Sequence, residues 1–357
     1  MTVRSVGLIG LIAAGMSGVP RYAASLLRAL DQVADEYADL HLRLVTTPAG
    51  AEAVRASALE VRLVGSSIGS PRSGGRRVLS EQVAAATERS DVLHFFDLTG
   101  PVLTPWRRFV STVHDASQPR AYKRVVQPWA ARHAAALVAV SAHARDEAVR
   151  AFHADRARIA VIHSGPGLEA TAPRDETASP PDAPYLLYVG DLTEHKNLPF
   201  LVDVFATAGV PDRLVLAGRP GTGYEELRAE IDASPARDRI DVVVAPTDGE
   251  LDRLYRRAVA TVLPSLREGF GFTPLEAMAR GCPVLASDLP ALREVLADGA
   301  LLLPLGSQRP WVDAVRRIAA DSTLRGDFQG RARKVLERYS WERTARAVCD
   351  LFRSLNG

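Results

Sequence analysis

The sequence of 357 residues is short of several features that would each indicate a particular class of protein. It has only two cysteines, Cys282 and Cys349, which is too few for a disulfide framework or a zinc site and favours a reducing, cytoplasmic compartment. Its 44 basic and 42 acidic residues leave a net charge of +2, so we expect no nucleic acid as a partner. No apolar run reaches the length of a membrane span.

The sequence near the N-terminus also lacks a dinucleotide-binding motif. Residues 6–11 are apolar and of strand length, and Gly15 and Gly18 follow them before an amphipathic helix. The glycines do not form G-x-G-x-x-G, so the sequence does not indicate a dehydrogenase. No clear cleavage site follows the apolar residues, so we interpret them as a strand and not as a signal peptide. Gly18 either makes a turn or lets the backbone approach a ligand.

The remaining composition is that of a globular protein, with 47% apolar and 24% charged residues. The length suits two α/β domains, and strand-length apolar runs alternate with helical patterns as in doubly wound sheets. Residues 169–184 are polar, rich in proline and without periodicity. We therefore predict a first domain over residues 1–168, a linker over residues 169–184, and a second domain that begins at residue 185.

Residues 263–304 contain the strongest motif. Two carboxylates, Glu268 and Glu276, flank a loop that leads into a short helix. Thr273 fits the N-cap, and Pro274 fits the first helical position. Glu276 would then occupy the third helical position, N3, and complete a capping box. A phosphate would then find donors at the positive end of this helix. The predicted donors are the backbone N–H groups of Gly271, Phe272 and Thr273.

Each part of this motif also has a structural reading. Many helices have a capping box without a ligand, and a loop glutamate such as Glu268 is ordinarily solvated. Together, two carboxylates around a phosphate seat suit a ligand with hydroxyl groups on both sides of a phosphate. A nucleotide-sugar is such a ligand.

Two further residues are candidates because of their place after strands. His114 ends the apolar residues 109–114, and ligands in open α/β sheets bind beyond the carboxyl ends of strands. Lys196 follows a strand, a glycine turn and the start of a helix, where a cation can hold phosphate. On frequency alone, His114 is a structural histidine and Lys196 a surface lysine.

The segments around these residues resemble the retaining glycosyltransferases of the GT-B fold that carry a Glu-x7-Glu motif, the group 1 type. The resemblance covers nearly the whole chain and includes PSLREGFG, LEAM, GCPV, SDLPALREV, STVHDAS, SGVPRYAASLLRAL and YVGDLTEHKNLPFLVDVF. It implies two Rossmann-like doubly wound domains that face each other across a cleft. The first would lie on the acceptor side. Residues 185–339 would bind the nucleotide-sugar, and residues 340–357 would form a helix that crosses back to the first domain.

The resemblance also implies an activity. A sugar would move from a nucleotide diphosphate sugar, the co-substrate, to a hydroxyl acceptor such as a glycan, a lipid or a natural product, with retained configuration. In family terms, Glu276 holds the ribose, Glu268 holds a hydroxyl of the donor sugar and His114 faces that sugar. Lys196 grips the diphosphate, and the loop with Gly18 lies under the donor phosphates. No Asp-x-Asp dyad stands at a strand end, so we expect neither a catalytic metal nor another cofactor.

The sequence departs from the family at Asp191, where an arginine usually grips the diphosphate. A carboxylate cannot hold phosphate directly, so other groups must neutralise the charge. The candidates are the helix at Thr273, the loop with Gly18, Arg267 and His195. Asp191 keeps open a nucleotide-sugar-binding module without activity. The shared fold also leaves open an epimerase or phosphorylase and a pseudo-glycosyltransferase.

Residues 121–140 contain basic and aromatic side chains on or near a helix: Lys123, Arg124, Trp129, Arg132 and His133. Such a helix is either solvated or touches a membrane surface, as it does in lipid-acceptor members of the family. The second reading would place the protein at the inner face of the membrane.

Overall fold

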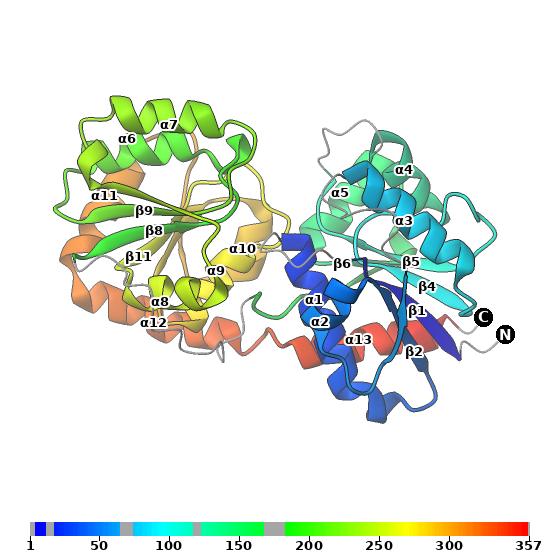
Figure 1. Ribbon diagram of the computed structural model, residues 1–357. Coiled ribbons are helices and arrows are strands. Elements are labelled where there is room, and N and C mark those ends of the chain that lie inside the picture. Colours follow the sequence, from blue (N-terminus) through cyan, green and yellow to red (C-terminus); the bar gives the residue numbers. More distant parts are fainter. Residues whose placement is uncertain (1–3, 12–17, 65–73, 117–122, 168–182, 356–357) are drawn as a thin grey trace. The chain divides into compact units, whose positions relative to one another are not determined.

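A computed structural model describes residues 4–11, 18–64, 74–116, 123–167 and 183–355 (Figure 1). Gly15 and most of the expected linker, residues 169–182, lie outside this described part. The chain divides into two compact units. The first comprises Met1–Gly165 with Tyr339–Gly357, and the second comprises Pro166–Arg338.

The first unit is built on a sheet of seven parallel strands in the order β3-β2-β1-β4-β5-β6-β7. The strands are β1 (Ser5–Ile9), β2 (His41–Thr46), β3 (Glu60–Leu63), β4 (Val92–Phe95), β5 (Phe109–Val113), β6 (Ala136–Ala139) and β7 (Ile159–Val161). Its helices are α1 (Gly18–Val33), α2 (Pro48–Val54), α3 (Gly74–Thr87), α4 (Lys123–His133), α5 (Ala142–Phe152) and α13 (Trp341–Ser354). Figure 1 shows α1, α2 and α13 on one face of the sheet and α3, α4 and α5 on the other.

The last helix, α13, completes the core of the first unit. It buries one face, with Val348 and Phe352 fully enclosed, and packs beside α1. Trp341 lies against Gly165, where a Cβ atom would come within 2.5 Å of the indole ring. The helix therefore supplies one side of a sheet that begins more than 300 residues earlier in the chain.

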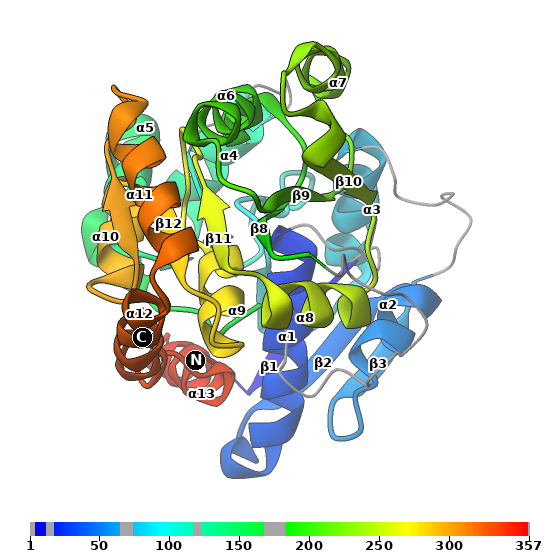
Figure 2. The same cartoon turned by 90° about the vertical axis from the view of Figure 1, so that its left-hand side faces the viewer.

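The second unit has a sheet of six parallel strands in the order β10-β9-β8-β11-β12-β13. The strands are β8 (Tyr185–Val189), β9 (Arg213–Gly218), β10 (Ile240–Val244), β11 (Ala260–Leu263), β12 (Val284–Ser287) and β13 (Leu301–Leu303). The helices are α6 (Leu198–Ala208), α7 (Tyr224–Ala233), α8 (Asp248–Arg257), α9 (Phe272–Ala279), α10 (Pro290–Leu296), α11 (Arg309–Ala320) and α12 (Ser322–Leu336). Figure 2 shows α6 and α8 on opposite sides of the strands.

Both sheets confirm the predicted doubly wound α/β architecture. In each, the first strand of the unit lies inside the sheet and the chain winds outward in both directions from it. The direction reverses between β8 and β11 in the second unit, and ligands bind beyond the carboxyl ends of strands at such a point. This point positions the candidate site.

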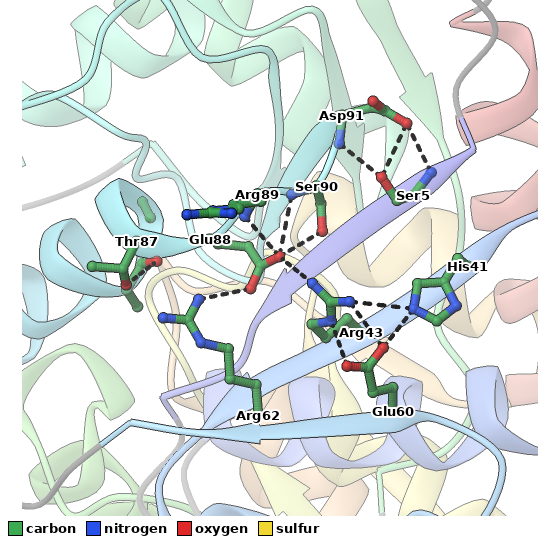
Figure 3. A network of polar contacts seen from close by, with 12 residues as sticks. Ser5, His41, Arg43, Glu60, Arg62, Thr87, Glu88, Arg89, Ser90 and Asp91 are labelled. Atoms are coloured by element: carbon green, nitrogen blue, oxygen red, sulfur yellow. Dashed lines mark hydrogen bonds and ion pairs between the residues drawn. The ribbon is translucent and has the colours of Figure 1, made fainter.

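The amino edge of the first sheet contains a buried carboxylate, Glu88, whose side chain has no exposed surface (Figure 3). It accepts hydrogen bonds from Arg43 at 3.1 Å, Arg62 at 2.9 Å and the Ser90 hydroxyl at 2.8 Å. Burial opposes the charge, but the donors outweigh it and lower the pKa of Glu88 to about 2. Gly7 makes room, because a Cβ atom there would lie 2.7 Å from the Glu88 side chain.

Candidate functional site

The two loops at the switch point of the second sheet meet through an ion pair. Lys196 lies on the loop after β8 and Glu268 on the loop after β11. The Lys196 Nζ donates to Glu268 Oε1 at 2.6 Å, and the two side chains are 16% and 13% exposed. The Leu266 N–H donates to the His195 carbonyl at 2.9 Å, which also ties the loops together. The structure thus brings together two residues that lie 72 positions apart in the sequence.

A tight local turn presents Lys196. The residues Glu194–Lys196 form a 3-10 turn, which the Asn197 N–H closes by donating to the Glu194 carbonyl at 3.0 Å. Asn197 has a left-handed backbone with φ of 56°, and α6 begins directly after it. Asparagine tolerates this conformation better than most residues. The turn therefore holds Lys196 at a point where the chain reverses direction.

The helix after Glu268 starts earlier than predicted, so the expected capping box is wrong. Its N-cap is Gly271, with φ of 104°, and Phe272 is the first helical residue. Thr273 lies inside the first turn, and its hydroxyl donates to the Val189 carbonyl at 3.2 Å. This bond fastens α9 to the end of β8, at the same edge as Lys196. A Cβ atom on Gly271 would lie 2.8 Å from Leu292, so this start requires glycine.

The hydrogen-bond partner of the Glu276 side chain also differs from the one that a capping box predicts. Its side chain is buried, and the Tyr255 hydroxyl donates to its Oε2 at 2.9 Å. Tyr255 lies on α8 and is completely buried. The tyrosine therefore fixes the orientation of the carboxylate. Nothing in the sequence near Glu276 indicates this partner, because it comes from a different helix.

His195 is a poor candidate for a phosphate cation. Burial, followed by the charge of Lys196, lowers the pKa of His195 below its ordinary value. Its Nδ1 lies 3.1 Å from the Thr193 hydroxyl. The lowered pKa disfavours the protonated imidazole, so His195 is a weaker source of positive charge for a diphosphate than an arginine would be.

Asp191, at the position of that arginine, lies beside a residue that the sequence did not single out. The Arg219 Nε is 3.5 Å from Asp191 Oδ1. Arg219 follows β9, and Asp191 follows the neighbouring β8. The fully buried Tyr188 donates its hydroxyl to the Asp191 carbonyl at 3.0 Å. Burial, followed by the charges of Glu268 and Asp191, raises the pKa of Tyr188. All of these residues therefore belong to one electrostatic environment.

A cavity of about 260 Å³ lies next to this environment, between the loop after β8 and the start of α7. Its lining includes Glu194 and Glu226 but neither Lys196 nor Glu268. Two carboxylates would repel a phosphate, so this cavity is not the diphosphate seat.

Two predicted residues lie in the first unit. His114 directly follows β5, and its Nε2 donates to the Phe96 carbonyl at 2.9 Å. Its ring meets the edge of the Tyr22 ring with a centroid distance of 4.7 Å. Gly18 is the first residue of α1, and a Cβ atom there would have no neighbour within 4 Å among the residues that the structure describes. Packing against those residues therefore does not require glycine at this position.

The part of the chain that the structure describes gives two further findings. Within it, no group of three or more His, Cys, Asp or Glu side chains could hold a metal ion. Among its helices, none is both long and apolar enough to span a bilayer.

Two family models match the chain. "Glycosyltransferase Family 4" matches residues 16–169, and "Glycosyl transferases group 1" matches residues 170–335. The D-inositol 3-phosphate glycosyltransferase of Corynebacterium urealyticum is 31% identical over 227 residues, which cover 57% of this chain and 53% of the relative. The O-antigen chain mannosyltransferase RfbU of Salmonella typhimurium is 27% identical over 205 residues, with 57% and 56% covered. The chain thus spans about half the length of these curated relatives.

Solved structures share the fold over the full chain. Sucrose-phosphate synthase from Thermosynechococcus elongatus has a TM-score of 0.76 at 21% identity, with 99% of each chain covered. Anabaena HepE, in complex with UDP and glucose, has a TM-score of 0.74 at 16% identity, with 99% of this chain and 100% of HepE covered. The two family models together extend over both units, and the likeness to each of these two structures covers 99% of this chain. The chain belongs to the group 1 glycosyltransferases of the GT-B fold.

Proposed function

We propose that this protein is a retaining glycosyltransferase that moves a sugar from a nucleotide diphosphate sugar to a hydroxyl acceptor without a metal ion. The observation that carries the proposal is the Lys196–Glu268 pair at the switch point of the second sheet, beside the start of α9. This arrangement supplies a cation and a helix N-terminus for phosphate, and a carboxylate for a sugar hydroxyl.

The chemistry requires stabilisation of a leaving diphosphate. The bond between the anomeric carbon and the phosphate oxygen breaks, and a bond from the acceptor oxygen to that carbon forms on the same face. The acceptor proton goes to the leaving phosphate. Lys196 and the first turn of α9 would stabilise the negative charge that develops on the diphosphate. Glu268 would lose its contact with Lys196 and accept a hydrogen bond from a hydroxyl of the donor sugar.

Three other predicted residues have roles in this proposal. Glu276, which Tyr255 orients, would accept hydrogen bonds from the ribose hydroxyls. His114 would take part in the same reaction, with its Nε2 proton held by the Phe96 carbonyl. Gly18 begins α1 and would let the backbone approach the donor phosphates.

A binding screen followed by a transfer assay tests the proposal. A ligand that binds only the folded state raises the melting temperature, so UDP, GDP and their sugar conjugates should raise Tm, whereas nucleosides should do so less. The HepE complexes with UDP and with UDP-glucose motivate the UDP series, and the mannosyltransferase name of RfbU motivates a mannose donor. Sugar transfer to a hydroxyl acceptor should persist in EDTA.

Other results would favour the alternatives. Donor binding without turnover for any acceptor, together with an unchanged Tm response in Glu268→Ala, would indicate a binding module. Conversion of the donor sugar without transfer would indicate an epimerase. Loss of transfer in EDTA, restored by Mg²⁺ or Mn²⁺, would contradict the metal-independent mechanism.

We also propose that the first unit binds an anionic membrane surface, which would place the enzyme at the cytoplasmic face of a membrane. Large exposed apolar side chains lie on α3, on the loop after β4 and on α4. They are Leu79, Val83, Val102, Leu103, Trp106 and Val125. Trp106 is 77% exposed and Leu103 is 62% exposed. Gln82 holds the loop against α3, because its amide donates to the Gly100 carbonyl at 2.7 Å and accepts from the Leu103 N–H at 3.1 Å.

The charges of this apolar surface favour anionic lipid over a protein partner. Glu81, Glu88 and Asp97 are buried, whereas the basic side chains of Arg89 and Arg124 are exposed. Trp and apolar side chains beside basic ones suit the lipid headgroup region. Trp129, which the sequence suggested for this contact, instead stacks on Phe109 at 5.6 Å and takes part in packing.

Vesicle sedimentation tests this surface. The protein should sediment with vesicles of phosphatidylcholine and phosphatidylglycerol, less so in high salt, and not with phosphatidylcholine alone. A double variant, Leu103→Ser with Trp106→Ser, should bind at least about tenfold more weakly, because each side chain would otherwise bury apolar area. Val244→Ser, which changes a 54% exposed side chain of the second unit, is the control. Equal binding of all three proteins would contradict the proposal.

A further inference from the structure

The loops after β8 and β9 run as neighbours beyond the ends of both strands. The Leu192 N–H donates to the Arg219 carbonyl at 2.8 Å, and Leu192 forms a parallel bridge with Pro220. A Cβ atom on Gly218 would collide with the Gly190 carbonyl, so glycine allows the two backbones to approach this closely. The backbone therefore places the residue that follows Gly190 beside the residue that follows Gly218, at the carboxyl edge of the sheet.

Those two residues are Asp191 and Arg219. Their contact is long, at 3.5 Å between Arg219 Nε and Asp191 Oδ1, and their side chains are 40% and 38% exposed. Ion pairs of this kind contribute little to folding stability. A guanidinium has five N–H donors, and a single carboxylate oxygen near Nε cannot satisfy them all. The pair is therefore poorly explained as a stabilising contact.

The surroundings of the pair contain the proposed diphosphate seat. The charges of Asp191, Glu268, Lys196 and Arg267 all act on His195, and those of Asp191 and Glu268 act on Tyr188. Lys196 and Arg219 each face one carboxylate, so the charges of these two pairs sum to zero. A diphosphate bound at this edge would contact two cations, and the guanidinium can bind two of its oxygens at once.

We propose that Arg219 binds the donor diphosphate together with Lys196, and that Asp191 is a positioning residue that holds the guanidinium at the sheet edge. This inference rests on the proposed function. It accounts for the aspartate at position 191, because the positive charge comes from the neighbouring strand. Arg219 is better placed for this than the predicted candidate His195, whose pKa is lowered by burial.

Calorimetric titration with UDP and GDP tests the assignment, and the diphosphate that binds the unchanged protein is then used throughout. Arg219→Ala should weaken binding of that diphosphate by about ten- to a hundredfold, as expected for a lost charged hydrogen bond. Binding of the corresponding nucleoside, measured by ligand-observed NMR, should change less than twofold because a nucleoside has no phosphate. Arg219→Lys should fall between the two proteins.

The matched control lies at the other end of the same strand. Arg213 begins β9 and pairs with Asp241 at 2.6 Å, with side chains that are 30% and 36% exposed. Arg213→Ala removes an arginine–aspartate pair of similar exposure from the amino edge, and should leave diphosphate affinity unchanged. A decrease equal to that of Arg219→Ala would overturn the inference, because it would indicate a general effect of charge or stability.

A pair of substitutions that reverses the two charges provides a second test of the role of Arg219. Arg219→Asp alone should weaken diphosphate binding more than Arg219→Ala does, and addition of Asp191→Arg should restore at least about a tenth of the original affinity. Unchanged affinity in Arg219→Ala, or equal losses for diphosphate and nucleoside, would overturn the role of Arg219 and leave the proposed function intact. If the unchanged protein binds neither diphosphate, the proposed function itself fails.

Discussion

The two sheets carry contacts between carboxylates and cations at opposite edges, and these contacts differ in how fully each carboxylate is satisfied. At the amino edge of the first sheet, Glu88 accepts from two arginines, one hydroxyl and the backbone of Arg89 and Ser90. At the carboxyl edge of the second sheet, Glu268 has one short contact among the described residues, with Lys196. A saturated buried carboxylate stabilises the fold, whereas a carboxylate with one cationic partner can exchange it for a ligand.

The largest expected effect concerns the exchangeable pair. Lys196→Ala should reduce glycosyl transfer by about a hundred- to a thousandfold, because a positive charge next to the leaving diphosphate is lost. Glu268→Gln should reduce it as well, and activity is compared per folded molecule because the pair is largely buried. Steady-state kinetics with the identified donor measures the effect. Lys334→Ala, which changes an exposed lysine of the same unit, is the control, and an equal reduction in that variant would contradict the assignment.

The opposite behaviour is expected at the saturated network. Glu88→Gln should lower the free energy of unfolding by about 3 to 5 kcal/mol, because it breaks a buried pair and leaves two arginines without their carboxylate. Transfer activity per folded molecule should not change. Urea unfolding measures the stability, and Glu60→Gln, at a carboxylate with 47% exposure in the same network, should cost less than about 1 kcal/mol. Similar losses in both variants would contradict the difference between the two sites.

The same network predicts a pH dependence. The pKa of Glu88 falls from 4.5 to about 2 on folding, so its contribution is complete above pH 4.5 and is lost as the pH decreases toward 2. The contribution amounts to about 3 kcal/mol. The difference in unfolding free energy between the unchanged protein and Glu88→Gln should therefore shrink between pH 5 and pH 2.5. A constant difference over this range would show that the carboxylate does not hold a lowered pKa.

The sequence predicted the framework of the carboxyl edge but not its contacts. Apolar runs of strand length predicted β8 and β11, and the motifs around Lys196 and Glu268 were identified separately. Their pairing depends on the strand order, which brings together loops that are distant in sequence. The Thr-Pro-x-Glu pattern suggested an N-cap at Thr273, but the left-handed Gly271 starts the helix earlier and frees the threonine to bind Val189. Arg219 and Tyr255 were missed because their partners lie on other elements.

A smaller effect is expected at Tyr255, whose only proposed part in function is to orient Glu276. Tyr255→Phe removes the hydroxyl that donates to the carboxylate and should raise the donor KM by up to about tenfold, with little change in kcat. Tyr185→Phe is the matched control, because it removes a buried hydroxyl that donates to the Leu254 carbonyl at 2.8 Å. It should lower Tm without raising KM. An unchanged donor KM in Tyr255→Phe would remove the tyrosine from the site.

A crystal structure of the protein with bound UDP or GDP tests the central claim most directly, because it shows whether Lys196 contacts the phosphate or Glu268. The account predicts that the Lys196 Nζ lies within hydrogen-bond distance of a phosphate oxygen and that its contact with Glu268 is broken. A nucleotide bound elsewhere, with the Lys196–Glu268 pair still intact, would contradict it.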